Sequence, residues 1–118
     1  MSRSKRTRLT DSTEFDRVYK QGVAFRGKLF SVHAFPNDLD TPRLGLSVSR
    51  KVGNAVTRNT VRRRLKEVFA SMIDEVPGSL DLVVSARPSA AGASFDELGD
   101  EFGRSLRKIA EKGAGRKA

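Results

Sequence analysis

Hydrophobic side chains recur with a helical spacing between about residues 55 and 73. They occupy positions i, i+4, i+7 and i+11, which lie on one face of an α-helix. The four residues are Val61, Leu65, Val68 and Met72. Asn54 and Thr57 are both of the types that cap helix N-termini. The pattern therefore predicts a helix that packs by one face and begins close to one of these two residues.

Two other segments show the same periodicity. Apolar residues recur at i, i+3 and i+4 over roughly 12–21, and Asp11 with Glu14 three residues later is typical of a capped helix start. Ser94 with Glu97 forms a candidate capping box for a third helix. The apolar stripe of that helix consists of Phe95, Leu98, Phe102, Leu106 and Ile109. Both helices are expected to pack through their stripes.

Alternating apolar and polar residues predict four strands. They cover about 23–26, 28–35, 43–49 and 80–86, with Gly27 as a turn or bulge between the first two. The order α-β-β-β-α-β-α predicts an α+β fold with one sheet. The strands in the middle of the chain favour an antiparallel meander, and the last strand must return after a helical crossover. The 118 residues are expected to form a single domain (1–118), with basic flexible tails at about 1–9 and 111–118.

Charge sets the middle helix apart from the rest of the chain. The 23 Lys and Arg residues outnumber the 14 Asp and Glu residues, and the net charge is +9. Seven of the basic residues lie between Arg50 and Lys66, and the next acidic residue is Glu67. Like charges one turn apart on a helix repel each other, and a helix selected only for stability would interleave Glu. Because a polyanion relieves this repulsion, the segment predicts a nucleic-acid-binding surface.

Composition narrows the classes of function. A run of about 18 apolar residues would be needed for a transmembrane helix and none is present. The basic N-terminus lacks the apolar segment of a signal peptide, so a cytoplasmic protein is expected. The chain has no cysteine and a single histidine, which disfavours disulfides, thiolate zinc sites and Ser-His-Asp catalysis. Acidic residues are scattered, which argues against a self-sufficient metal-dependent nuclease.

A second candidate site combines aromatic side chains with small polar strand faces. Phe15 and Tyr19 share one face of the first helix, where either core packing or stacking on bases would explain them. Small side chains and one histidine line the strand faces, which are either simply exposed or leave room for an extended ligand. These strand residues are Ser31, His33, Gly45 and Ser47. If the two faces meet, they form a groove for a single strand with weak sequence preference.

The segment RLGLSVSRKVGNAVTRNTVRRRLK, residues 43–66, resembles the signature of the bacterial ribonuclease P protein component. The RNR motif of that family, Lys/Arg-x-Gly-Asn-Ala-Val-x-Arg-Asn-x-x-Lys/Arg-Arg, is matched without gaps over 51–63. The similarity extends to the spacing of Phe15 and Tyr19 and to a strand that ends in Ala-Arg-Pro at 86–88. Arg62, where many relatives have Lys, and Lys66, where they often have Arg, are mild departures.

The resemblance implies a fold, a function and partners. The fold is an α-β-β-β-α-β-α two-layer sandwich, ribosomal-protein-S5-like, with a left-handed βαβ crossover where the default is right-handed. The function is that of the accessory subunit of ribonuclease P, an endonuclease that removes the 5′ leader of precursor tRNA. The catalytic RNA carries the chemistry and holds Mg²⁺, so neither catalytic residues nor metal ligands are expected in the protein. The expected partners are the catalytic RNA and precursor tRNA, without a membrane or an obligate protein partner.

The resemblance also assigns residues to two surfaces. Contact with the catalytic RNA is expected from Arg50, Lys51, Asn54, Arg58, Asn59, Arg62, Arg63 and Lys66. The cleft for the leader is expected to include Phe15, Tyr19, Ser31, His33 and Ser47. A ribosomal or structural RNA-binding protein remains an alternative that only the RNR motif disfavours. A helix-turn-helix DNA-binding protein would need two helices joined by a short turn, whereas a strand and a glycine turn precede the basic helix.

Overall fold

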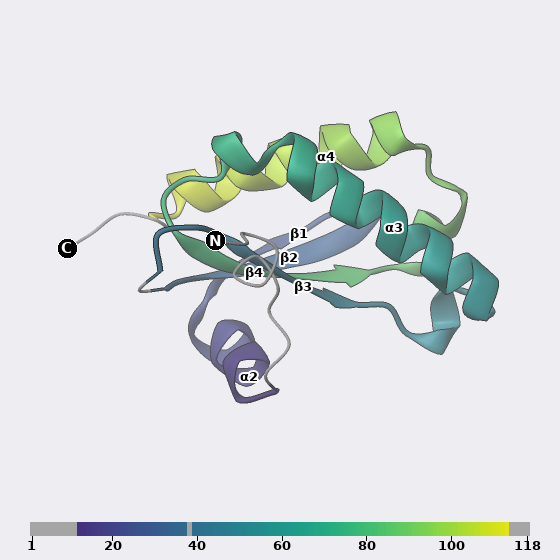
Figure 1. Cartoon of the computed structure of the whole chain (residues 1–118), viewed down its shortest axis with the longest axis horizontal. Helices are drawn as coiled ribbons and strands as arrows, with labels where there is room; N and C mark the ends of the chain where they lie inside the picture. Colours follow the sequence, from purple (N-terminus) through teal and green to yellow (C-terminus); the bar gives the residue numbers. More distant parts are fainter. Residues whose placement is uncertain (1–11, 38, 114–118) are drawn as a thin grey trace.

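A four-stranded sheet in the order β1-β2-β4-β3 forms the centre of the protein. The computed structural model describes residues 12–37 and 39–113. The helices and strands are α2 (Ser12–Gln21), β1 (Val23–Arg26), β2 (Phe30–Pro36), β3 (Arg43–Ser47), α3 (Ala55–Ser71), β4 (Leu80–Ala86) and α4 (Phe95–Glu111). Helices α3 and α4 cover one face of the sheet, and α2 lies on the other (Figure 1). The α+β class and the predicted order of elements are confirmed.

The predicted boundaries agree with most of these elements. The first helix, the first strand and the last strand have the predicted limits, whereas the third strand ends at Ser47 and α3 at Ser71. Helix α4 extends to Glu111, the first residue of the expected C-terminal tail, and residues 114–118 of that tail lie outside the described residues. The predicted capping role of Asp11 and the tail at 1–9 lie outside the described residues.

Strand pairing differs from the antiparallel meander that the sequence favoured. β1 and β2 form an antiparallel hairpin, but β4 lies between β2 and β3, antiparallel to β2 and parallel to β3. The cause is the composition of β4, whose residues Leu80, Leu82, Val83 and Val84 are all buried. A strand that is apolar toward both faces is most stable at the centre of a sheet. The meander prediction is therefore wrong, and the apolar run in β4 was the signal for its central place.

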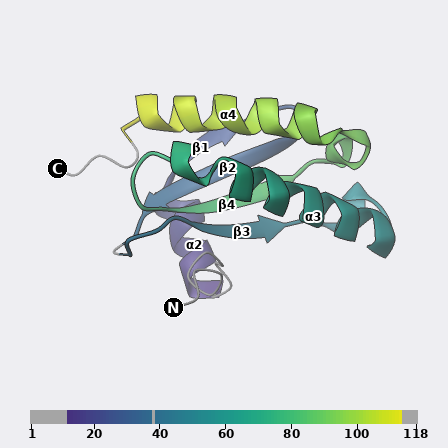
Figure 2. The ribbon, with the colours of Figure 1, turned by 45° about the horizontal axis from the view of Figure 1, so that its top comes forward.

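The connection from β3 through α3 to β4 is a crossover between neighbouring parallel strands. Seen from the side that carries α3, with β3 pointing upward, β4 lies to the left of β3 (Figures 1 and 2). The crossover is therefore left-handed, as the family resemblance implied and the common right-handed rule did not. This arrangement leaves β3 at the edge of the sheet, and the chain passes from this edge directly into the basic segment.

The main core lies between the sheet and the helices α3 and α4. Side chains at alternate positions of β2 and β4 pack against the helix stripes, and the predicted stripe of α3 is buried except for half-buried Met72. Phe69, which the predicted stripe omitted, is buried as well. Phe95 was predicted to belong to the core, but 44% of it is exposed. Periodicity predicts that Phe95 points toward the core side of α4. It does not predict whether a neighbouring helix or strand extends far enough to cover the first turn of α4, where Phe95 lies.

Local capping signals decide where α3 and α4 begin. Asn54 is the N-cap of α3, because its Oδ1 accepts a hydrogen bond of 2.9 Å from the backbone N–H of Thr57. Gly53 precedes it with φ of 156°, and a Cβ there would lie 2.9 Å from the Thr57 Cβ. Ser94 and Glu97 form the predicted capping box of α4. Of the two candidate caps of α3, the structure therefore selects Asn54.

Candidate nucleic-acid interface

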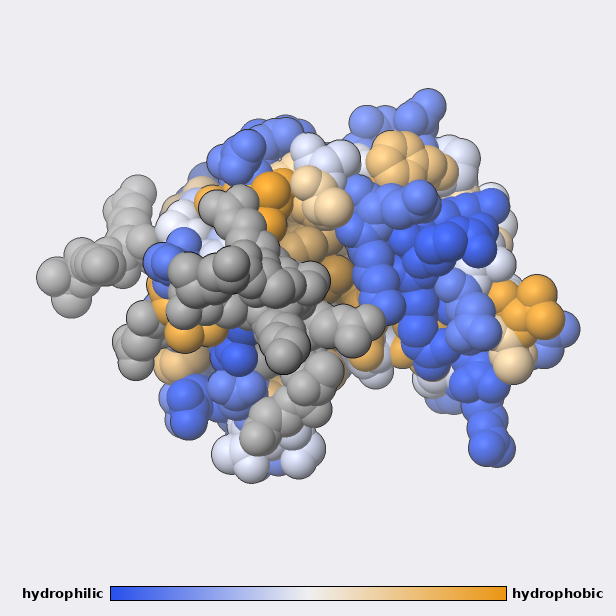
Figure 3. Space-filling view, viewed as in Figure 1, coloured by the Kyte–Doolittle hydropathy of each residue, from blue (hydrophilic) through white to orange (hydrophobic). Residues whose placement is uncertain are grey.

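The eight residues predicted to contact RNA form one surface on α3 and on the turn before it, which we call the basic surface. Its members are Arg50, Lys51, Asn54, Arg58, Asn59, Arg62, Arg63 and Lys66. All are exposed except Arg58 and Arg62, which are half-buried. Hydrophilic side chains gather over α3 in the space-filling view (Figure 3). The glycine turn and the Asn54 cap join the two cations of the turn at Arg50–Val52 to those of the helix.

The arginines of α3 differ in the hydrogen bonds that they form inside the protein. The Arg62 Nη1 donates a hydrogen bond of 2.9 Å to the Asn59 Oδ1, which holds both side chains on the same side of α3. Arg64, which was not assigned to the RNA surface, donates from Nη1 to the carbonyl oxygen of Ala93 at 3.0 Å and ties α3 to the segment before α4. The buried Nε of Arg58 has no hydrogen-bond partner among the described residues. Arg58 thus offers a donor that only a ligand or a rearrangement would satisfy.

Strand register arranges the opposite face of the sheet into rows of side chains. Directly paired residues point to the same face. One row consists of Arg26, Ser31, Ser85 and Ser47, and we call it the polar row. The next row consists of Ala24, His33, Val83 and Gly45, and a third of Phe35, Asp81 and Arg43. Contacts with α2 show that these rows face that helix.

Helix α2 covers the second and third rows and reaches the polar row with one side chain. Val18 of α2 packs on Val83, with Phe15 and Phe35 packed against them. The Tyr19 ring lies over His33, with the ring centroids 4.7 Å apart and the planes inclined by 59°. The Tyr19 hydroxyl forms a 2.5 Å hydrogen bond with the Ser85 Oγ. The aromatic face of α2 and the small polar face of the sheet therefore meet, and the polar row is left beside them.

The predicted cleft residues divide into those that are covered and those that remain accessible. Gly45 is buried beside Val83 and is thus covered, whereas Phe15 is half-buried, packs against the cluster around Val18 and stays a predicted residue of the cleft. Tyr19 is 38% exposed, Ser47 is exposed, and Ser31 and His33 are half-buried. Ser85, one of the two inner members of the polar row, was missed by sequence reasoning. Only its register opposite Ser31 and Ser47 reveals it.

His33 is held as a neutral aromatic ring at neutral pH. Burial lowers the pKa of its imidazole, and the positive charge of Arg26 lowers it further. Its buried Nδ1 has no hydrogen-bond partner within the described part of the chain. An uncharged ring next to Tyr19 suits stacking on a base better than ion pairing with a phosphate.

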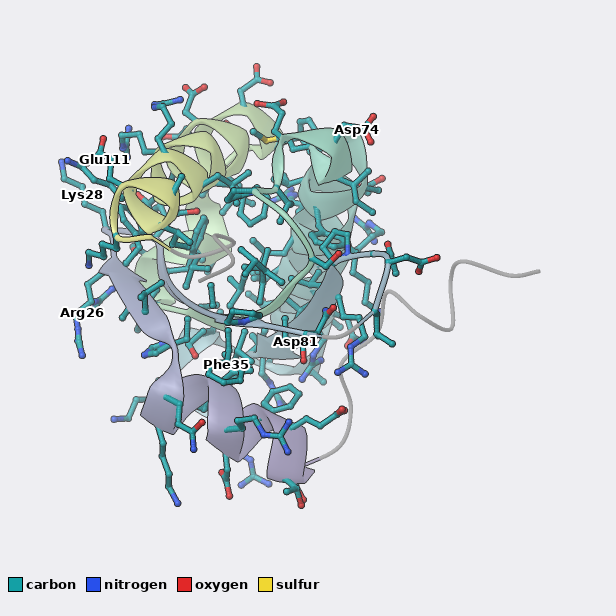
Figure 4. The ribbon with its side chains drawn as sticks, turned by 90° about the vertical axis from the view of Figure 1, so that its left-hand side faces the viewer. Arg26, Lys28, Phe35, Asp74, Asp81 and Glu111 are labelled. Carbon is teal, nitrogen blue, oxygen red and sulfur yellow. The ribbon has the colours of Figure 1, made fainter. Side chains whose placement is uncertain are left out.

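An ionic network holds the start of α2 against the sheet. Arg43 donates to both carboxylate oxygens of Asp81, from Nε at 2.8 Å and from Nη2 at 2.7 Å. The same Nη2 reaches the Glu14 Oε2 on α2 at 2.8 Å, and the Asn37 Nδ2 donates to the Asp81 Oδ1 at 2.8 Å. Phe35 and Asp81 both project from the sheet toward α2 (Figure 4). The hydrogen bond to Asp81 raises the pKa of Arg43, which stays charged.

A buried carboxylate on α4 organises the turn between β1 and β2. Glu101 is 2% exposed, and its Oε2 accepts hydrogen bonds from the backbone N–H groups of Leu29 at 2.8 Å and Phe30 at 3.1 Å. Its Oε1 accepts a longer one of 3.3 Å from Lys28. A Cβ on Gly27 would lie 2.4 Å from the Glu101 Oε2. Sequence reasoning missed both Asp81 and Glu101. Asp81 interrupts the apolar run of β4, which is the available signal for a buried partner, whereas Glu101 stands among other charged residues and gives no such signal.

Neither a metal cluster nor a membrane helix is found in residues 12–37 and 39–113. No three His, Asp or Glu side chains lie together in a way that could hold a metal ion. No helix there is long and apolar enough to cross a bilayer. The two buried carboxylates already have partners within the protein. Asp81 pairs with Arg43, and Glu101 accepts hydrogen bonds from backbone N–H groups.

Comparison with known proteins gives consistent matches over nearly the whole chain. The family model described as Ribonuclease P matches residues 3–110. The ribonuclease P protein component of Acidothermus cellulolyticus is 39% identical over 108 residues, which are 90% of each chain. That of Clostridioides difficile is 41% identical over 91 residues, covering 76% of this chain and 80% of the relative.

Solved structures show the same similarity in three dimensions. A Staphylococcus aureus RNase P protein mutant, described as defective in mRNA degradation activity, superposes with a TM-score of 0.81 at 32% identity. The superposition covers 92% of this chain and 91% of that one. The RNase P protein of Thermotoga maritima gives a TM-score of 0.72 at 28% identity, covering 82% and 96% of the two chains.

Proposed function

Since the chain belongs to the ribonuclease P protein family, whose members are protein components of an endoribonuclease, we propose that it binds the catalytic RNA and the 5′ leader of precursor tRNA. The observation that carries this proposal is the continuity of two surfaces. Ser47 ends β3 in the polar row, and Arg50 begins the basic surface three residues later. An RNA held on α3 would therefore lie next to the polar row and Tyr19, which we call the leader groove because together they suit a single strand.

The basic surface is suited to the backbone of a folded RNA. Its cations point outward from a helix that the sheet and α4 hold on the other side. Guanidinium groups bind phosphates through two parallel hydrogen bonds, and each neutralised phosphate releases counterions. The surface offers two exposed amides, and both amide oxygens already accept hydrogen bonds, that of Asn54 from Thr57 and that of Asn59 from Arg62. Recognition by shape and phosphate contacts, rather than by base edges, follows from this composition.

The groove beside α2 is suited to the leader. Tyr19 and His33 supply aromatic rings, and the polar row supplies hydroxyl groups without bulk. Stacking on aromatic rings tolerates any base, and hydroxyl groups can bind phosphate or ribose oxygens. The protein would thus hold a single strand with weak sequence preference. Ser85 joins the predicted residues Ser31 and Ser47 in this role.

In this division of labour the protein binds and positions, while the RNA subunit carries the chemistry. Mg²⁺ would be held mainly by the RNA, because the described residues offer no cluster of carboxylates that fits the ion. In this proposal, which follows the family resemblance, the metal ions and the catalytic groups belong to the RNA subunit. The protein's contribution would be to bring the leader and the catalytic RNA together, which lowers the entropic cost of reaching a productive geometry.

The decisive experiment is cleavage of a precursor tRNA at low Mg²⁺ concentration. It compares the protein alone, a bacterial ribonuclease P RNA alone, and the mixture of both. We expect cleavage at the mature 5′ end by the mixture only. Cleavage by the protein alone would contradict the assignment of the chemistry to RNA, and a mixture no faster than the RNA would contradict the accessory role.

Tyr19 gives the most direct test of the leader groove. Replacing Tyr19 with alanine is expected to weaken binding of precursor tRNA by about 1–3 kcal/mol, the range for loss of one base-stacking side chain. Binding of mature tRNA, which has no leader, should not change. The measurement is the dissociation constant of each RNA from the reconstituted enzyme. Tyr19→Phe keeps the ring and loses only the hydrogen bond to Ser85, so it should retain most of the preference for precursor.

Arg62→Ala is the matched control on the other surface. It should weaken the association of the protein with the catalytic RNA and lower the salt dependence of that association by about one unit. Its effect on precursor and mature tRNA should be the same. If Tyr19→Ala also weakens both by the same factor, Tyr19 does not touch the leader.

A further inference from the structure

The polar row crosses the whole sheet and ends on Arg26. Arg26 pairs with Ser31, Ser31 with Ser85, and Ser85 with Ser47, so one residue of each strand takes part. Neighbouring strands lie about 4.8 Å apart, and the row is therefore about 14 Å long. Arg26 and Ser47, at its two ends, are exposed, while Ser31 and Ser85 between them are half-buried. The row is a line of small polar side chains with a cation at one end, and the Tyr19 hydroxyl bonds to it at Ser85.

Arg26 lies on the face of the sheet that carries the polar row, opposite the face covered by α4. It projects from the β1 edge of the sheet, apart from Lys28 and Glu111 at the end of α4 (Figure 4). Its positive charge acts on His33, which lies in the adjacent row of the same face. Among the residues that the structure describes, no carboxylate forms an ion pair with Arg26. Its guanidinium is therefore available to an anion that lies along the row.

We propose that Arg26 binds a backbone phosphate of the leader at the β1 edge and sets how much leader the protein holds. This inference rests on the proposed function, because the strand in the groove is taken to be the leader. The catalytic RNA would lie on α3, which the chain enters just after β3. A leader that departs from this RNA enters the polar row at Ser47 and passes Ser85 before it arrives at Arg26. The phosphate at Arg26 is therefore farther from the cleavage site than the nucleotides beside Tyr19.

The chemistry of the row fits this order. Tyr19 and His33 flank its middle, where a base can stack. The serine hydroxyls on either side can donate to phosphate or ribose oxygens. At the far end a guanidinium presents a planar fork that matches a phosphate in two hydrogen bonds. A leader too short to cross the sheet would reach the serines and Tyr19, but not Arg26.

The test measures affinity as a function of leader length. Dissociation constants are determined for the reconstituted enzyme with precursor tRNAs whose leaders grow one nucleotide at a time, and with mature tRNA. In the wild-type protein, affinity should rise with leader length and then level off. Arg26→Ala should remove the last increment, weakening long leaders roughly fivefold to tenfold while short leaders bind as before. For long leaders alone, the salt dependence should fall by about 0.7, the value for one contact to a single strand.

Lys28→Ala is the matched control, because it removes the same charge two residues away. The Lys28 side chain lies at the α4 side of the same edge, and its backbone contact with Glu101 does not involve the side chain (Figure 4). It should leave the length profile unchanged. Thermal unfolding of both variants verifies that each remains folded at the temperature of the assay.

Each outcome separates this inference from the function on which it rests. If the wild-type enzyme binds precursor no more tightly than mature tRNA, both the leader groove and the role of Arg26 are wrong. If affinity rises with leader length in the wild type and rises equally in Arg26→Ala, the leader still binds beside α2, but Arg26 does not contact it. An equal loss in Arg26→Ala and Lys28→Ala, or an equal loss for all leader lengths, would show a general effect of charge and overturn the proposed contact.

Discussion

Replacing Arg43 with alanine is expected to lower the free energy of unfolding by about 3–5 kcal/mol. The reason is the partner that the change leaves behind. The side chain of Asp81 is only 8% exposed and accepts two hydrogen bonds from Arg43, so without this cation a buried carboxylate loses its counter-charge. The hydrogen bond from Asn37 remains, but it cannot neutralise the charge. Urea unfolding followed by circular dichroism measures the loss, which is a large part of the 5–15 kcal/mol typical of small domains.

The same change should also weaken the leader groove. Arg43 bonds the start of α2 to the sheet by way of Glu14, and α2 carries Tyr19. A looser α2 holds Tyr19 less firmly over His33, so the preference for precursor over mature tRNA should decline together with stability. Asp81→Ala removes the buried charge itself and should cost less than Arg43→Ala.

Glu14→Gln is the control that separates the two halves of the network. The side chain of Glu14 is 33% exposed, so its pair with Arg43 is partly screened by water and is worth at most about 1 kcal/mol. We expect a small loss of stability from this change. If Arg43→Ala costs no more than Glu14→Gln, the buried pair does not hold the sheet as the geometry indicates.

Glu101→Ala is expected to have an effect of similar size on another part of the molecule. The carboxylate is the acceptor for the backbone N–H groups of Leu29 and Phe30 and, at longer distance, of Lys28. Each donor left unsatisfied in a buried place costs about 1–3 kcal/mol, and truncation of the side chain adds a cavity. The expected total is about 3 kcal/mol or more, which corresponds to a fall in Tm on the order of 10 °C. Calorimetry or thermal unfolding by circular dichroism measures it.

Arg104→Ala provides the comparison for Glu101. Arg104 pairs with the same carboxylate at 3.3 Å, but its side chain is 54% exposed, so removing it should change stability by no more than about 1 kcal/mol. The loss of stability from Glu101→Gln should lie between the losses from Glu101→Ala and Arg104→Ala. The amide keeps one acceptor oxygen, but it turns an NH₂ group toward backbone donors. Equal Tm values for Glu101→Ala and Arg104→Ala would mean that the backbone bonds of Glu101 contribute little. A displaced β1–β2 turn would also move Arg26, which lies one residue before Gly27.

Short-range sequence patterns were sufficient to predict the helices. The extent of α2, the Asn54 cap and the Ser94 capping box all follow from residues within one or two turns of each other. The concentration of cations between Arg50 and Lys66 is equally local, and it was enough to predict a surface for a polyanion. The RNR motif lies in this same segment, which is why family membership could be read from one continuous stretch.

The strand order, and with it the set of residues beside α2, depends on contacts between residues that are far apart in the sequence. β4 displaces β3 from β2 because its apolar run is most stable in the middle of the sheet, and this choice alone places Ser85 between Ser31 and Ser47. Tyr19 meets Ser85 across 66 positions of sequence, and Glu101 meets Leu29 across 72. The antiparallel meander failed for the same reason.

The sequence by itself determined the helices, the capping box of α4, the class of the fold, the basic surface and the family. These properties arise from side chains within a few positions of each other, whose spacing and hydrogen bonding are set by the geometry of the backbone. Only the tertiary structure decided the strand order, the ionic network around Arg43, the buried Glu101 and the row that ends on Arg26. Those features depend on which distant segments exclude water from each other, and burial of that kind is a property of the whole chain.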